Sequence, residues 1–293
     1  MVPTLVREPP QSGEWLHEIK YDGYRTQLVL DDAGVRAFTR RGFDWSDRYP
    51  GLLAAAGELR CSSAILDGEA IVQDENGRPD FGRFAEAMVS RPGDLVFMAF
   101  DLLHLNGKDM RQLPLVERRA ALVELVGCHE PSCRIQYSEH VADGPSLFEA
   151  ADRMGLEGIV SKRATSRYRS GPSAAWLKSK CVTTAEFVVI GTQPPQNGPA
   201  CALLAREGVD GLEYVGSAFV TLSDRDREAF WRDMDRLRRG GPAVPMAARS
   251  GASWVEPRVR VRARFLKGSD KLRHASLVAL LPDSANGRRA GSG

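Results

Sequence analysis

The stretch His17-Glu18-Ile19-Lys20-Tyr21-Asp22-Gly23-Tyr24-Arg25 decides more about this chain than any other. Apolar and polar residues alternate over 15–19, which predicts a β-strand, and the Asp-Gly pair that follows predicts a turn. Lys20 therefore stands at the end of a rigid element, with Arg25 five residues later. A lysine held in this way can attack a phosphate, but the same string is also typical of a charged surface hairpin. The rest of the chain has to supply the partners that a nucleophilic lysine needs.

Length and composition set the broad class. The 293 residues suffice for one large domain or two smaller ones. An apolar fraction of 43% and a charged fraction of 27% are ordinary for a soluble globular protein. No stretch has the length of a membrane span, and the first residues lack the pattern of a secretory signal. The five cysteines are scattered and never spaced C-x-x-C, so we expect reduced thiols in a cytoplasmic protein.

Positive charge is concentrated in the C-terminal part. Residues 1–180 carry 23 lysines and arginines against 26 acidic residues, whereas residues 181–293 carry 17 against 12. The excess gathers in a basic stripe: Arg258, Arg260, Arg262, Arg264, Lys267, Lys271 and Arg273. Such a stripe is either a solvated strand face or a surface for a polyanion.

Two domains of different character are predicted. Residues 1–182 mix strands, at 64–72, 95–103, 158–162 and 176–182, with helices at 114–126 and 146–154, a pattern typical of an α+β domain. Residues 183–283 contain short strands at 186–191, 201–206 and 212–220, a helix at 224–239 capped by Ser223, and a long strand at 255–265. This second pattern predicts a small β-barrel such as an OB-fold. The polar tail 284–293 is predicted to be disordered.

Four further segments place polar groups at predicted strand ends or turns: Phe38-Thr39-Arg40-Arg41-Gly42, Leu66-Asp67-Gly68-Glu69-Ala70, Glu157-Gly158-Ile159-Val160-Ser161-Lys162-Arg163 and Trp176-Leu177-Lys178-Ser179-Lys180. Together with Lys20 they describe a phosphate site. Positive charge would come from Arg25, Arg40, Lys178 and Lys180, while the Glu69 and Glu157 carboxylates could hold Mg²⁺ or ribose hydroxyls. A lysine nucleophile must be neutral, a state that nearby cations and a metal favour. The chain has no P-loop motif and no G-x-G-x-x-G motif, so the sequence does not support a P-loop fold or a dinucleotide-binding fold.

These motifs, in this order, resemble those of the covalent nucleotidyltransferases, which comprise ATP-dependent DNA ligases, RNA ligases and mRNA-capping guanylyltransferases. The resemblance covers residues 15–181 and includes Phe100-Asp101-Leu102-Leu103. It is strongest to the ligase domain of bacterial LigD-type ligases of non-homologous end joining. Three segments support that subfamily: Trp15-Leu16-His17-Glu18-Ile19-Lys20, Thr39-Arg40-Arg41-Gly42-Phe43-Asp44-Trp45 and Leu272-Arg273-His274-Ala275-Ser276. The resemblance implies an adenylation domain of antiparallel sheets with flanking helices, followed by an OB-fold domain.

The resemblance also implies roles for individual residues. Lys20 would take AMP from ATP and pass it to the 5′-phosphate at a DNA break, where the 3′-hydroxyl would displace it. ATP would lie against Glu18, Ile19, Arg25, Arg40, Glu69, Phe100, Lys178 and Lys180, with Phe100 stacked on adenine and Glu69 at the ribose. Glu157 and Glu69 would hold Mg²⁺ or Mn²⁺. DNA would contact Arg40, Arg41, Arg260, Arg262, Arg264, Lys267 and Arg273, and the barrel would move as a lid between steps.

Two departures from the family pattern affect the DNA contacts. Arg41 stands where the family usually has asparagine, and Arg262 stands where it often has an acidic residue. The alternatives are RNA ligation, GTP capping, or a break-binding module that has lost catalysis. An NAD⁺-dependent ligase is disfavoured, because 19 residues precede Lys20 and no zinc spacing follows. The resemblance further implies a bacterial cytoplasmic monomer that acts on nicked or broken double-stranded DNA. The end-binding protein Ku and separate polymerase and nuclease proteins would be its partners.

Overall fold

The computed structural model describes residues 1–75, 77–127, 132–194, 199–209, 211–267 and 271–282. The chain divides into two compact units, Met1–Cys181 and a second that begins at Val182. This division lies one residue before the boundary expected from the sequence. The tail predicted to be disordered, 284–293, lies outside the described residues.

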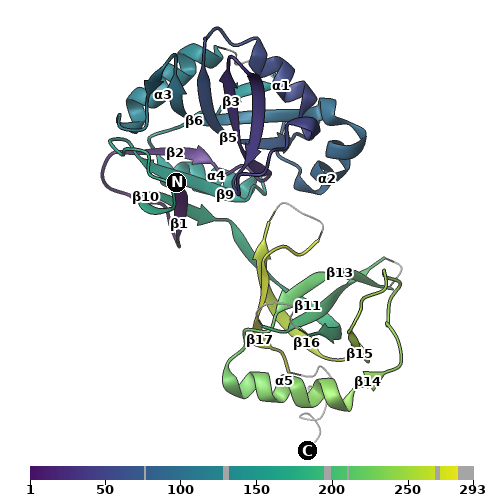
Figure 1. Ribbon diagram of the computed structural model, residues 1–293. Helices are drawn as coiled ribbons and strands as arrows, with labels where there is room; N and C mark the ends of the chain where they lie inside the picture. Colours follow the sequence, from purple (N-terminus) through teal and green to yellow (C-terminus); the bar gives the residue numbers. More distant parts are fainter. Residues whose placement is uncertain (76, 128–131, 195–198, 210, 268–270, 283–293) are drawn as a thin grey trace, which may run out of the picture. The chain divides into compact units, whose positions relative to one another are not determined.

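The first unit contains two sheets with helices against them (Figure 1). Its strands are β1 (Val2–Val6), β2 (Trp15–Ile19), β3 (Tyr24–Asp31), β4 (Gly34–Thr39), β5 (Ala64–Val72), β6 (Leu95–Leu105), β7 (Lys108–Asp109), β8 (Ile135–Tyr137), β9 (Gly158–Arg163) and β10 (Pro172–Lys180). Its helices are η1 (Ser46–Arg48), α1 (Pro50–Gly57), α2 (Phe81–Ser90), η2 (Pro92–Asp94), α3 (Leu115–Val126) and α4 (Gly144–Arg153). The expected α+β architecture is confirmed.

The larger sheet of this unit has the strand order β4-β3-β5-β6-β7, with β8 parallel to β6. One face of it carries the main core, built from residues such as Leu28, Leu66 and Phe97 together with the apolar sides of α1, α2 and α3. The smaller sheet has the order β1-β10-β9-β2, and α4 packs on β2 and β9. The start of α4 follows from its sequence, because the Asp143 side chain accepts a hydrogen bond from the Ser146 amide at 3.1 Å and caps the helix.

The second unit is a closed barrel. Its strands are β11 (Val182–Gln193), β12 (Cys201–Gly208), β13 (Gly211–Phe219), β14 (Arg238–Arg239), β15 (Ser253–Val255), β16 (Arg260–Leu266) and β17 (Ala275–Leu280), and its helix is α5 (Asp224–Arg236). The order β12-β13-β17-β16-β11 is closed by pairing of β11 with β12, which leaves the interior to apolar side chains. Helix α5 lies beside the barrel (Figure 1). It is capped by Ser223, as predicted, and buries Phe230 and Met234 in that core. The OB-fold expectation is confirmed.

Three local predictions need correction. The long strand expected at 255–265 is broken, because β15 ends at Val255 and β16 starts at Arg260. Pro257 lies in the break, and proline has no N–H to donate to a neighbouring strand. The strand expected at 176–182 begins earlier, at Pro172, and ends at Lys180, while Val182 already belongs to β11. The thiols are not all reduced, since Cys133 is disulfide-bonded.

No helix in the described part of the chain is both long and apolar enough to cross a membrane.

Candidate active site

A cavity of about 180 Å³ lies in the first unit, between strand ends of its two sheets. Eight of the residues predicted to bind the nucleotide line it: Glu18, Ile19, Lys20, Arg25, Arg40, Glu69, Phe100 and Lys178. Val2, Pro3, Tyr21, Val160, Lys162 and Trp176 complete the wall. Residues that are up to 160 positions apart in the sequence therefore meet in one place, as a nucleotide site requires.

Lys20 lies directly after β2 and is held at both its main chain and its side chain. Its amide donates to the Gly158 carbonyl at 2.9 Å, and its ammonium donates to the Glu157 carboxylate. The other oxygen of Glu157 forms an ion pair with the Lys180 ammonium at 3.3 Å. Glu157 and Lys180 do not line the cavity, but Glu157 contacts Lys20, and Lys180 contacts Glu157. Glu157 is buried, so these pairs are less screened than surface pairs.

Two glycines explain why the motifs around Lys20 contain Asp-Gly and Glu-Gly. A Cβ on Gly23 would lie 2.1 Å from the Ala70 carbonyl oxygen, so β3 can start close to β5 only with glycine there. Gly158 has a φ of +142°, and a Cβ on it would lie 2.1 Å from the Ser179 carbonyl oxygen. Both glycines let strands that carry site residues approach closely.

Arg25 and Asp67 form a buried pair beside the cavity. The guanidinium donates to both carboxylate oxygens, at 3.0 Å and 2.6 Å, and the Tyr168 hydroxyl donates to Asp67 at 2.8 Å. Burial alone would raise the pKa of Asp67, but the Arg25 guanidinium holds it below its ordinary value. The same guanidinium lies 5.5 Å from the centre of the Phe100 ring. Asp67 was missed as a site residue because its partner is 42 positions away.

Glu69 sits directly opposite Arg25 in the pairing of β3 with β5. Burial raises the pKa of Glu69 to about 7, and the neighbouring carboxylates of Glu157 and Asp67 act in the same direction. Lys20 and Arg25 oppose this increase. A carboxyl group with this pKa changes charge near neutral pH, which is a common property of functional sites.

Lys178 projects from β10 on the same face as Lys180, as the spacing of two residues predicts. Burial lowers the pKa of Lys178, and so do the nearby cations Lys180, Lys20 and Arg40. Four cations, Lys178, Lys180, Lys20 and Arg40, are therefore close together, and Glu157 is the carboxylate that opposes their effect on the pKa of Lys178. Such a cluster favours an anion such as a phosphate.

The Glu18 side chain is held by two buried cations. It lines the cavity, but its carboxylate is buried and paired with Arg119 at 2.6 Å and with Lys162 at 2.8 Å. Neither partner was predicted. The segment 157–163 did suggest that Lys162 is buried, because it follows an apolar run, but this segment alone does not reveal that Glu18 is the partner of Lys162.

The carboxylates available for a metal are Glu69 and Glu157. Among the residues that the structure describes, no group of three or more His, Cys, Asp or Glu side chains is placed to hold an ion. Mg²⁺ commonly binds one or two carboxylates and completes its shell with phosphates and water. Glu69 lines the cavity, Glu157 contacts Lys20 of the same cavity, and Glu157 acts to raise the pKa of Glu69, as a nearby like charge does. The two residues therefore fit such an ion when a nucleotide is bound.

The residues predicted to contact DNA lie on two surfaces, one in each unit. Arg40 and Arg41 are exposed at the turn after β4, where Gly42 has a φ of +80°. Beside this turn is a groove of about 600 Å³ that shares Val2, Arg25 and Arg40 with the smaller cavity.

In the second unit, Arg260, Arg262 and Arg264 point outward from β16 while Val261 and Ala263 enter the core. Arg260 and Arg262 each contact Glu186 at 3.1 Å. Lys267 and Arg273 are half-buried, and burial lowers the pKa of Arg273. Arg258 belongs to the break before β16 and not to the strand.

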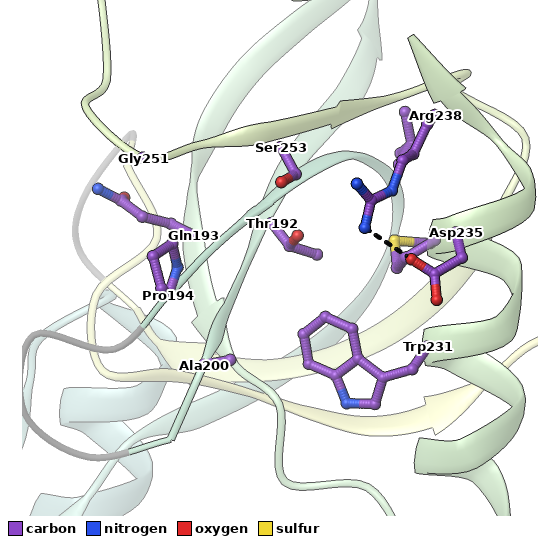
Figure 2. A pocket seen from close by; sticks show the side chains of 11 residues that line it. Thr192, Gln193, Pro194, Ala200, Trp231, Asp235, Arg238, Gly251 and Ser253 are labelled. Carbon is purple, nitrogen blue, oxygen red and sulfur yellow. Dashed lines mark hydrogen bonds and ion pairs between the residues drawn. The ribbon is translucent and has the colours of Figure 1, made fainter.

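A cavity of about 370 Å³ lies in the second unit (Figure 2). Trp231 and Asp235 of α5 line it, together with Thr192 and Ser253, and Asp235 pairs with Arg238 at 2.8 Å. It contains none of the residues predicted to act on a nucleotide. The cavity around Lys20 is therefore the candidate active site.

Comparison with known proteins identifies the family of this chain. Residues 5–180 match the family model of the ATP dependent DNA ligase domain. The chain is 40% identical over 272 residues to the multifunctional non-homologous end joining protein LigD of Pseudomonas aeruginosa. This alignment covers 87% of this chain and 31% of that protein. The chain is also 30% identical over 285 residues to the multifunctional non-homologous end joining DNA repair protein LigD of Mycobacterium tuberculosis, which covers 93% and 37%. The chain thus spans about a third of the length of these relatives.

A solved structure of mycobacterial DNA ligase D, complexed with ATP and MES, is similar with a TM-score of 0.55 and 29% identity. The similarity covers 96% of this chain and 95% of that one. The match therefore includes both units as well as the segments around Lys20. This chain belongs to the ATP-dependent DNA ligase domain family.

Proposed function

We propose that this chain is an ATP-dependent DNA ligase that seals breaks through a covalent AMP on Lys20. The observation that carries the proposal is the single cavity in which Lys20 meets Glu69, Phe100, Arg40 and Lys178. An amine, a group of cations and an aromatic wall are the parts that transfer of a nucleotide to lysine needs.

In the first step the Lys20 amine attacks the α-phosphorus of ATP. A nitrogen–phosphorus bond forms, the bond to the β-phosphate oxygen breaks, and pyrophosphate leaves. Glu157 orients the amine, because it contacts Lys20 directly. Lys178, Lys180 and Arg40 offset the negative charge of the phosphates. In the second step an oxygen of the DNA 5′-phosphate attacks the AMP phosphorus and releases Lys20. In the third, the 3′-hydroxyl attacks the 5′-phosphorus and AMP leaves.

The nucleoside is proposed to lie between Phe100 and the strand that leads to Lys20. Phe100 would stack on adenine, while Arg25 and Glu69 would face the ribose. Mg²⁺ or Mn²⁺ held by Glu69 and Glu157 would offset charge on the phosphates and on the leaving pyrophosphate. The raised pKa of Glu69, about 7, supports a site that gains from a nearby cation.

Nicked or broken double-stranded DNA is the proposed second substrate. Arg40 and Arg41 would contact the strand at the break, and the groove of about 600 Å³ that Arg40 borders is large enough for a nucleotide. Arg260, Arg262, Arg264, Lys267 and Arg273 would contact the phosphate backbone. Contacts of this kind position a duplex without reading its sequence, as a ligase requires.

The relatives named for non-homologous end joining suggest the biological context. We propose repair of double-strand breaks in the bacterial cytoplasm by a monomer of this chain. Ku, together with polymerase and nuclease activities, is proposed to act with it.

The test is to incubate the protein with labelled ATP and Mg²⁺ or Mn²⁺ and to locate the label by mass measurement. One AMP should be found on Lys20, and Lys20→Ala should abolish it. Lys108→Ala changes an exposed lysine of β7 outside the cavity and should leave the label unchanged. A Lys20→Ala protein that still carries covalent AMP would end the assignment of the nucleophile.

The substrate is tested next with nicked duplexes. Sealing of DNA nicks is expected. Label transfer from GTP, or sealing of RNA but not DNA, would instead indicate a capping or RNA-ligating enzyme. Binding of nicked DNA without any labelling would indicate a module that has lost catalysis.

A further inference from the structure

Strands β12 and β13, the second and third of the barrel, carry apolar side chains on both faces. Leu204 and Val215 enter the barrel core. Their neighbours Leu203 and Tyr214 belong to a separate apolar cluster on the outer face, because successive side chains of a strand point to opposite sides. In barrels of this fold, the outer face of these two strands commonly binds oligonucleotides. Whether this barrel can use that face depends on what covers it.

The segment 240–252, which connects β14 to β15, covers this outer face. Val244 is only 5% exposed and belongs to the same apolar cluster as Leu203. Arg249, near the other end of the segment, donates to the Tyr214 hydroxyl at 2.6 Å, and its guanidinium lies 5.1 Å from the centre of the Tyr214 ring. The face that this fold commonly offers to a nucleic acid is therefore closed by the chain itself.

A row of side chains crosses the other strands of the barrel on their outer side. Thr184 of β11 pairs with Arg264 of β16, and Arg264 pairs with Ser276 of β17. Ser276 pairs in turn with Phe219, at the end of β13. Directly paired residues point to the same side of a sheet, and Ala263, next to Arg264, enters the core, so the row faces outward. Phe219 is 42% exposed in this row.

The surface around this row is both basic and apolar. Arg260 and Arg262 project from β16 on the same side as Arg264. Val278 of β17 is 44% exposed and lies two residues after Ser276, so it extends the apolar end of the row. A DNA backbone presents anionic phosphates and, between them, the apolar carbons of deoxyribose. Cations beside an exposed ring match both parts of such a backbone.

We propose that a DNA duplex lies on the outer face of β11, β16 and β17, with the Phe219 ring against a deoxyribose at its edge. The outer face that segment 240–252 covers takes no part in binding. This inference rests on the proposed binding of DNA, and it adds an uncharged contact to the arginines of β16.

The face is tested by adding one negative charge at two places. Thr184→Glu puts a carboxylate in the row beside Arg264, and Ala248→Glu puts the same charge on the exposed surface of segment 240–252. Binding of a nicked duplex by the full chain is measured with EDTA and without ATP, from about 50 to 200 mM salt. Thr184→Glu should weaken binding on the order of tenfold at the lowest salt, and Ala248→Glu should stay within about twofold of the wild type.

The ring is tested in the same assay. Phe219→Ala should weaken binding on the order of fivefold, because apolar contact is lost. The dependence of log Kd on log salt should keep its slope, because the ring releases no counterion. Phe219→Leu retains apolar surface and should bind more tightly than Phe219→Ala. A barrel that failed to fold would lose its arginine contacts as well, and its slope would fall.

Each outcome decides one question. Equal weakening by Thr184→Glu and Ala248→Glu would overturn the choice of face. A Phe219→Ala protein with unchanged affinity, or with a loss that comes with a lower slope, would overturn the contact of the ring, as would a Phe219→Leu protein that binds as weakly as Phe219→Ala. A wild-type protein that does not bind nicked DNA at any salt would instead refute the proposed substrate, while AMP on Lys20 is measured separately.

Discussion

Replacing Asp67 with asparagine should destabilise the first unit more than any equal change at its surface. Asp67 is fully buried and accepts two hydrogen bonds from Arg25 and one from Tyr168. The substitution keeps the shape of the side chain but removes its negative charge. The new amide nitrogen cannot accept a hydrogen bond from Arg25 or Tyr168. Arg25 would then retain a positive charge with 17% of its side chain exposed and without the carboxylate to which it donates hydrogen bonds.

The magnitude follows from these contacts. Breaking a buried ion pair by removing one partner costs about 3–5 kcal/mol. We expect about 3 kcal/mol, the lower end, because the partly exposed guanidinium can reach water. Asp31→Asn is the matched control, since Asp31 pairs with Arg36 in the same sheet but both side chains are well exposed. An exposed pair contributes about 0–1 kcal/mol.

Hydrogen exchange of amides in β3 and β5 measures this loss, because the two units need not unfold together. The pKa of Asp67 is lowered in the folded state, so the stability from the pair is present above the unfolded pKa of about 3.9. It is lost as pH falls below that value. The difference between wild type and Asp67→Asn should therefore be constant from pH 5 to 8 and shrink below about pH 4. Equal protection at pH 7, or a difference that does not shrink in acid, would refute the reasoning.

Two further predictions concern charge. The pKa of Glu69 is raised to about 7, so kcat/KM for ATP should fall as pH decreases through this value. The Glu69→Gln variant should have low activity and should lose this pH dependence. A pH profile of kcat/KM in the variant that is the same as in the wild type would contradict this role. Glu186 offsets Arg260 and Arg262, so Glu186→Gln should bind nicked DNA about fivefold more tightly at low salt, with the gain lost at high salt. The same charge change at Glu228 of α5 is the control, and an equal effect there would argue against a specific surface.

The nature of many elements followed from local patterns, whereas the order of the strands in the sheets was not predicted. The apolar alternation before Lys20 predicted β2, and Ser223 predicted the start of α5, because periodicity and capping depend on neighbours in the chain. The long strand at 255–265 was wrong because apolar alternation continues across a break that Pro257 imposes. The apolar alternation does not reveal that one residue lacks an N–H when the residues on both sides of it continue to alternate.

Residue types and their spacing were enough to select Lys20, Glu69, Lys178 and Lys180, because the resemblance fixes those positions without knowledge of their contacts. What these side chains touch was decided only by the tertiary structure. Glu18 pairs with Arg119, 101 positions away, and Lys20 contacts Glu157, 137 positions away. A buried carboxylate is stabilised by whichever cation the packing brings to it, and local sequence carries no record of that partner. The sequence by itself therefore determined which groups can react, and the fold decided which buried partners hold Glu18 and Lys20 in place.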